Sequence, residues 1–295
     1  MIAVPMFDAE FLKRLEYLSL LSKQAFNGKL LAQRRSKRIG SGIEFADHRD
    51  YLYGDDLRYL DWNVFARHGD LLLKRFQEEE DLHVYLLLDA SASMDTGEPN
   101  KFRFARQIAA ALAYIALADM DRVSVVAYDH KIVNTLPLMR GKNNVLRLLE
   151  FLESLSAGGE GTDLKAVVDD FSRRASKRGL ALVISDLYDQ EGFQAGIDRL
   201  RHQRFDPHVI QVQSPQEVSP PWLGDIELVD AETGRRSNRT ITQEARQRYL
   251  DRFALFNESV EKYCHSYGLS HARATSDVPF DAVLLKMMRT ANFTQ

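Results

Sequence analysis

Residues 84–93 read VYLLLDASAS, an unbroken apolar run that is followed at once by a short polar segment. An apolar run of this length is typical of a parallel strand that is buried on both faces of its sheet. Side chains at alternate positions of extended backbone point the same way, so Asp89, Ser91 and Ser93 are expected on one side. We therefore predict a buried strand that brings three oxygen-bearing side chains to the carboxyl end of a sheet.

Strands and helices alternate along the chain after this run. The predicted order is strand 84–88, helix 102–117, strands 122–128 and 131–136, helices 143–155 and 164–176, strand 180–185, helix 193–204 and strand 208–212. The strands at 122–128 and 131–136 are joined by two residues, which indicates a hairpin. This order predicts an α/β fold with a doubly wound, mostly parallel sheet, helices on both faces and one antiparallel edge strand.

Three parts of the chain differ in character. Residues 1–81 contain an amphipathic helix over 7–26 and then a stretch rich in both charged and aromatic side chains. Residues 82–214 hold the alternating strands and helices. Residues 215–295 follow a proline-marked linker and are predicted to contain a strand at 225–230, a turn at 232–239 and helices at 243–267 and 280–289. We predict an α/β domain between an N-terminal extension and a C-terminal α/β extension.

Composition and charge restrict the class of protein. The chain of 295 residues has a net charge of −3, which predicts no overall attraction to nucleic acid. The basic cluster at 34–38 is typical of a solvated helix end. The single cysteine, Cys264, cannot form an internal disulfide, and no apolar run approaches the roughly 20 residues that span a bilayer. With no signal-peptide pattern at its start, the chain is predicted to be cytoplasmic, without a membrane span.

Two further oxygen-bearing residues stand at matching places downstream. Thr162 follows a glycine-rich loop and opens a helix, and Asp186 ends the second buried strand. Ends of neighbouring parallel strands lie side by side, so Asp186 is expected to approach Asp89. Carboxylates and hydroxyls are hard ligands that Mg²⁺ takes, although Mn²⁺ or Ca²⁺ also suits them. In the simpler alternative the two serines cap the following helix and Asp186 only ends a strand.

The pattern Asp89-x-Ser91-x-Ser93, followed by Thr162 and Asp186, resembles the metal-ion-dependent adhesion site of von Willebrand factor A domains. The resemblance implies a von Willebrand factor A-like fold in which these five residues hold the metal, directly or through water. It also implies an open sixth position that a carboxylate of a partner protein fills. Such a carboxylate would complete the octahedron around a cation that two aspartates already neutralise.

A second resemblance lies mostly outside that domain. It is carried by Gly42-Ile43-Glu44-Phe45-Ala46-Asp47-x-Arg49-x-Tyr51, Gly54-Asp55-Asp56-x-Arg58, Asp61-Trp62 and Ala66-Arg67, and later by Ser270-His271-x5-Asp277-x2-Phe280. These segments resemble the signature of the bacterial domain-of-unknown-function-58 family. The resemblance implies a von Willebrand A-like core and an adaptor or co-chaperone role beside a MoxR-type AAA+ ATPase. Some members have membrane helices, and the sequence departs from them by showing none.

The charged and aromatic stretch from 44 to 67 allows two interpretations. It forms either a partner-binding surface or a structural subdomain in which Asp–Arg pairs surround a buried Trp62, because buried charges must be paired. The candidate partner-binding residues are Asp47, Arg49, Asp55, Asp56, Arg58, Trp62 and Arg67.

The sequence favours a binding module over an enzyme. It contains no P-loop, no dinucleotide-binding glycine motif and no nucleophile elbow. Only Asp163 and Asp189 neighbour the predicted site as possible general bases. We expect a metal-dependent protein-interaction module. A Mg²⁺-dependent phosphohydrolase using the same oxygens is one alternative, and a metal-free scaffold with a vestigial site is another.

Overall fold

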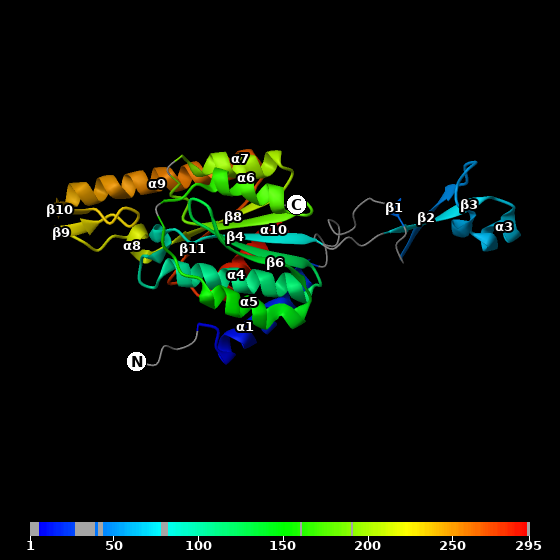
Figure 1. The fold of residues 1–295 in the computed structure, drawn as a ribbon, viewed down its shortest axis with the longest axis horizontal. Coiled ribbons are helices and arrows are strands. Elements are labelled where there is room, and N and C mark those ends of the chain that lie inside the picture. The colour runs from blue at the N-terminus through cyan, green and yellow to red at the C-terminus, as the bar shows by residue number, and fades with distance from the viewer. Residues whose placement is uncertain are drawn as a thin grey trace. The chain divides into compact units, whose positions relative to one another are not determined.

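The computed structural model describes residues 6–26, 39–40, 44–77, 82–159, 161–189 and 191–293 (Figure 1). The basic cluster at 34–38 lies outside these residues. The chain divides into two units, one formed by Met1–Lys23 with His83–Gln295 and the other by Gln24–Leu82. They are called here the large unit and the small unit, and each is described by itself.

A six-stranded sheet in the order β11-β8-β7-β4-β5-β6 forms the centre of the large unit. Its strands are β4 (His83–Asp89), β5 (Arg122–Tyr128), β6 (Ile132–Arg140), β7 (Leu180–Ser185), β8 (Asp206–Gln213) and β11 (Ser270–Thr275). β6 pairs with β5 antiparallel, and the other neighbouring strands pair in parallel. The predicted α/β fold, with a mostly parallel sheet and one antiparallel edge strand, is therefore confirmed.

Helices cover both faces of this sheet (Figure 1). One face carries α6 (Leu164–Arg174), α7 (Phe193–His202) and α9 (Gln243–Ser266), and the other carries α4 (Lys101–Ala118), α5 (Val145–Ser154) and α10 (Phe280–Phe293). Every residue of β4 is buried, as expected for a central strand that is covered on both sides. Among the described helices, none has the length and hydropathy that crossing a bilayer requires.

The core under α6 and α7 is built from alternate residues of the strands. Tyr85 and Leu87 of β4 pack with Phe171 of α6, and the Tyr85 and Phe171 rings meet edge to face at 5.0 Å. α7 approaches α6 closely at Gly196, where a β-carbon would lie 2.4 Å from Cγ of Leu164. This packing holds the carboxyl end of β4 and the start of α6 at the same edge of the sheet.

The structure divides the chain differently from the three-part prediction. α1 (Ala9–Phe26), assigned from the sequence to an N-terminal extension, packs in the large unit, where the Phe11 and Phe280 rings lie 4.7 Å apart. β11, from the predicted C-terminal extension, is an edge strand of the main sheet. Residues 232–239 were predicted as a turn, but β10 (Arg236–Ile241) pairs there with β9 (Gly224–Val229) in a hairpin.

The small unit has a three-stranded antiparallel sheet in the order β1-β3-β2. Its strands are β1 (Ile39–Gly40), β2 (Glu44–Asp50) and β3 (Leu72–Gln77), and α3 (Trp62–His68) connects β2 to β3. Asp61 begins α3, because its carboxylate accepts the backbone N–H groups of Asn63 and Val64. Leu60 and Leu73 are buried beneath these elements.

Candidate functional site

Three loops meet at the carboxyl edge of the sheet, beside the central strands. β4 and β7 are parallel neighbours, with Leu88 opposite Ile184. Asp89, the last residue of β4, and Asp186, which follows β7, are therefore close together, and both are almost fully buried. The predicted approach of these two carboxylates follows directly from this register.

Asp89 is held by short polar contacts on both carboxylate oxygens. One oxygen accepts the Ser91 N–H at 2.9 Å, and the other accepts the Ser185 hydroxyl at 2.5 Å. The hydroxyls of Ser91 and Ser93 lie 3.1 Å apart. Burial, and then the charge of Asp186, raises the pKa of Asp89 to about 7. Burial and the charge of Asp186 thus destabilise the ionised form of Asp89, which a bound cation would stabilise.

Asp186 is paired with a lysine that the sequence analysis did not single out. Nζ of Lys101 donates to Asp186 at 2.7 Å and to Glu217 of α8 (Pro215–Val218) at 2.6 Å. The Lys101 side chain is fully buried. Burial alone would lower the pKa of Lys101, but the charges of Asp186 and Glu217 outweigh it and the pKa is raised. Lys101 therefore stays charged and neutralises one carboxylate at this edge.

Thr162 lies on a loop that packs against the Asp89–Ser93 segment. The Gly158 N–H donates to the Ala90 carbonyl at 2.8 Å. Gly159 has φ +107°, and a β-carbon there would lie 2.4 Å from an Asp129 carboxylate oxygen, so the loop requires glycine at this position. Thr162 is 9% exposed at the end of this loop. The loop thus brings the fifth predicted ligand to the same edge.

The two carboxylates considered as general bases are both bound to helix or turn amides. Asp163 accepts the Ala166 N–H at 2.9 Å and begins α6. Asp189 accepts the N–H of Leu164 at 2.9 Å and that of Glu191 at the same distance. Their positions are those of capping residues.

The chemistry of these side chains fits a hard divalent cation. Among the described residues, no three His, Cys, Asp or Glu side chains gather as a metal site by themselves, so the hydroxyls are essential to any such site. The five oxygen-bearing residues are two aspartates, two serines and a threonine, which is a donor set of the kind that Mg²⁺ takes. Each bonded carboxylate oxygen keeps a second lone pair for a metal or for its bound water.

The candidate partner-binding residues of the small unit form surface ion pairs. Arg49 makes a two-pronged contact with Asp55, at 2.6 and 2.7 Å, and Arg58 pairs with Asp56. Asp47 lies on β2, and Arg67 is exposed on α3.

Trp62 does not lie inside these pairs. It is 59% exposed and stacks edge to face on Phe65, so the prediction of a buried Trp62 is wrong. Asp61, the residue before it, is nearly buried, caps α3 and bonds to His48, whereas Trp62 is the first helical residue and faces solvent.

Four residues of this edge were missed in the sequence analysis: Lys101, Ser185, Glu217 and Glu232. Two of them have a local signal, because Lys101 opens the helix after the DxSxS segment and Ser185 directly precedes Asp186. Glu217 and Glu232 come from distant segments, and their contacts depend on the tertiary fold. Glu232 lies in the turn between β9 and β10 and accepts the backbone N–H groups of Ser93 and Gly161.

Comparison with known proteins identifies the family to which this chain belongs. The chain is 29% identical over 232 residues to the uncharacterized protein Rv1480 of Mycobacterium tuberculosis, covering 77% of this chain and 73% of that one. Among solved structures it is similar to the conserved hypothetical protein BatB of Bacteroides thetaiotaomicron, with 15% identity, a TM-score of 0.43 and coverage of 70% of this chain and 99% of BatB. Residues 47–257 match the model of the protein family of unknown function DUF58, and the chain belongs to that family.

Proposed function

We propose that this protein is a metal-dependent protein-interaction module. Mg²⁺, or Mn²⁺ or Ca²⁺ in its place, is held by Asp89, Ser91, Ser93, Thr162 and Asp186, and an Asp or Glu side chain of a partner protein completes its coordination. One observation carries the proposal. The pairing of β4 with β7 brings the buried Asp89 and Asp186 to one edge, beside two serine hydroxyls 3.1 Å apart, so this edge has carboxylate and hydroxyl oxygens to offer a cation.

The proposed partner is a MoxR-type AAA+ ATPase, for which this protein acts as a cytoplasmic adaptor or co-chaperone. Membership of the DUF58 family supports this choice, together with the family resemblance described above. The small unit offers a second contact surface. Tyr53 is fully exposed beside the Arg49–Asp55 pair, and Trp62 and Phe65 are exposed on α3.

A binding role is better supported than phosphohydrolysis. A hydrolase that activates a metal-bound water needs a positioned base. The nearest candidates, Asp163 and Asp189, accept backbone amides at the start of α6.

Metal binding is tested by calorimetric titration of the intact protein with Mg²⁺. Asp89→Asn and Ser93→Ala are expected to weaken binding at least tenfold, because each removes a ligand oxygen or its charge. Ser154→Ala is the matched control, since this exposed hydroxyl on α5 bonds only to its own helix, at the Phe151 carbonyl. A hundredfold excess of Mg²⁺ over its dissociation constant should stabilise the wild type by about 2.7 kcal/mol. Equal heats for wild type and Asp89→Asn would contradict the proposal.

Partner binding is tested separately with a purified MoxR-type ATPase from the same organism. Retention on the immobilised wild type is expected with Mg²⁺, and loss is expected with chelator or with Asp89→Asn. Trp62→Ser should weaken retention without changing Mg²⁺ binding. Retention both in the presence of chelator and with Asp89→Asn would show that the interaction does not require the metal.

A further inference from the structure

Glu232 bridges the two loops that carry the candidate hydroxyl ligands. One of its carboxylate oxygens accepts the Ser93 N–H at 3.0 Å, and the other accepts the Gly161 N–H at 2.6 Å. Ser93 belongs to the loop after β4, and Gly161 directly precedes Thr162. The contact partners lie 139 and 71 residues away from Glu232 in sequence. A carboxylate of this chain is therefore already bound at the edge where an acidic group of a partner is expected.

The site that holds the Glu232 carboxylate is built from backbone N–H groups. Ser93 lies in the short 3-10 turn Ala92–Asp95, whose first amides have no partner within the turn. Gly161 has φ +97°, a conformation that favours glycine. Two N–H groups that converge on one carboxylate make charge-assisted hydrogen bonds, which are stronger than neutral ones. Because no side chain takes part, this pair of amides recognises a carboxylate whatever segment supplies it.

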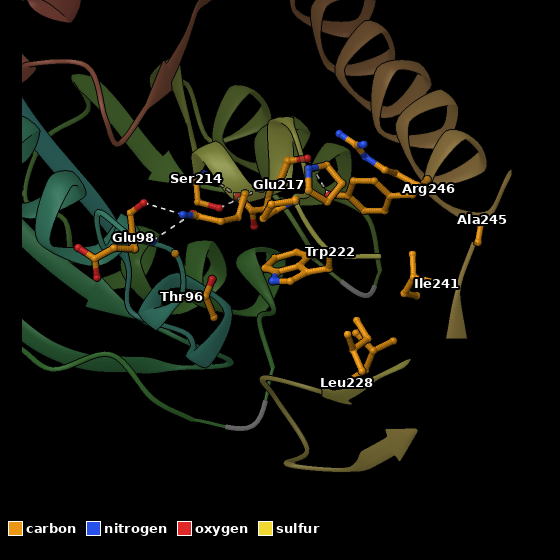
Figure 2. Close-up of a pocket in the computed structure, with 15 residues that line it drawn as sticks. Thr96, Glu98, Ser214, Glu217, Trp222, Leu228, Ile241, Ala245 and Arg246 are labelled. Carbon is orange, nitrogen blue, oxygen red and sulfur yellow. Dashed lines mark hydrogen bonds between the residues drawn. The ribbon is translucent and has the colours of Figure 1, made fainter. Parts of the chain in front are cut away.

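The hairpin that carries Glu232 is held loosely to the rest of the large unit. β9 and β10 pair only with each other, and most of their residues are exposed. A cavity of about 750 Å³ lies under the hairpin, lined by Leu228 and Ile241 on one side and by Thr96 and Trp222 on the other (Figure 2). Close packing is what normally fixes a surface element. With this space beneath the hairpin, the two hydrogen bonds of Glu232 are contacts that tie it to the loops of the site.

We propose that the Ser93 and Gly161 amides form a carboxylate-binding site, that Glu232 occupies it in the free protein, and that an acidic side chain of the partner displaces Glu232 together with its hairpin. The inference rests on the proposed function, since it names what fills the partner position in the absence of a partner. Covalent linkage gives Glu232 an effective concentration in the millimolar range. A partner must therefore compete with Glu232 for the two amides. The hairpin thus prevents binding of acidic ligands whose affinity is low.

The first test asks whether Glu232 protects the two amides. Amide hydrogen exchange of the intact, metal-free protein is followed by NMR in wild type, Glu232→Gln and Glu227→Gln. The control changes an acid on the same hairpin that pairs with Arg236 instead. Gln has one acceptor oxygen where Glu232 uses two, so exchange at Ser93 or Gly161, or at both, should accelerate at least tenfold in Glu232→Gln and stay unchanged in Glu227→Gln. Equal rates in wild type and Glu232→Gln would overturn the proposal.

The second test offers the same carboxylate as a separate molecule. The probe is a synthetic peptide of residues 224–241, and a version with Gln at position 232 is its control. The acidic peptide should bind Glu232→Gln protein at least tenfold more tightly than wild type, because the wild-type site is filled, and the Gln peptide should bind neither. Equal affinity of the acidic peptide for both proteins would refute displacement.

The two tests separate this inference from the metal proposal. If Mg²⁺ binds as expected while both Glu232 experiments show no difference, the interaction module stands and the internal carboxylate does not. If the amides respond to Glu232→Gln but Mg²⁺ gives no heat, the carboxylate site stands and the metal-dependent function fails.

Discussion

The large and small units use charged residues in opposite ways. At the sheet edge of the large unit, Lys101 and Asp186 are fully buried and share a third partner, Glu217. In the small unit the Arg58–Asp56 pair is exposed, with 84% of the Arg58 side chain accessible. Buried charges must be paired to persist, whereas surface pairs contribute little to stability. The Lys101–Asp186 pair therefore belongs to the interior of the large unit, whereas the Arg58–Asp56 pair lies on the surface of the small unit.

The chain supplies its own reporter for each unit. Its two tryptophans are Trp222 in the large unit and Trp62 in the small unit. Replacing either one with Phe leaves a single fluorophore, so that urea unfolding can be followed for each unit separately. The three predictions below use these single-tryptophan backgrounds.

The largest effect is expected from Lys101→Met. The substitution keeps the length of the side chain but leaves Asp186 and Glu217 without their shared cation. Breaking a buried pair in this way costs about 3–5 kcal/mol. Trp222 fluorescence during urea unfolding should show a clear fall in the midpoint. Arg58→Met is the matched change in the small unit and should leave the Trp62 midpoint unchanged; equal shifts for the two variants would erase the contrast between the units.

The second effect concerns apolar side chains within the small unit. Leu73 is 4% exposed, so Leu73→Ala removes buried methyl groups and should cost about 2–5 kcal/mol, read from Trp62 fluorescence. Leu57→Ala is the control, because Leu57 is 52% exposed and should leave the midpoint unchanged. A destabilisation by Leu57→Ala as large as that by Leu73→Ala would mean that the exposed apolar residues support the fold of the unit.

The same contrast explains what the sequence predicted. β4 and β7 could be predicted from the sequence because both faces of these strands are buried, and burial on both faces requires a continuous apolar run. β11 was not predicted because an edge strand needs fewer apolar residues, and the only apolar residues in its sequence SHARAT are two alanines. The sequence left Trp62 between a core and a surface position because an aromatic residue among charges fits both, and the structure contradicts the buried one.

The candidate ligands were predictable for a related reason. Asp89 ends a strand whose register is fixed by burial, so its place at the sheet edge follows from the local pattern. Ser93 does not continue the predicted extended backbone, because it lies in the 3-10 turn Ala92–Asp95. Glu232 had no such signal, because its role depends on a hairpin that returns to the sheet edge from a distant part of the chain. Periodicity shows where a strand ends but not which segment later covers it.

The smallest effect is a pH dependence confined to the small unit. A hydrogen bond from His48 at 2.9 Å is the largest cause that lowers the pKa of Asp61 from 3.8 to about 2. The folded unit thus keeps this carboxylate ionised at pH values where the unfolded chain binds a proton. Its stabilisation is complete above about pH 4 and is lost as the pH falls toward 2.

Trp62, the first residue of α3, adjoins Asp61 and should report this loss. We expect its fluorescence to stay constant from pH 7 to about 4 and to change between 4 and 2. Asp61→Asn retains a capping side chain but not the charge, so it separates the two roles of Asp61. The variant should lack the acid transition while α3 remains folded at pH 7, because Asn can still accept the amides of Asn63 and Val64. An unchanged transition in Asp61→Asn would assign the acid sensitivity to another carboxylate, and would show that the charge of Asp61 does not stabilise the small unit.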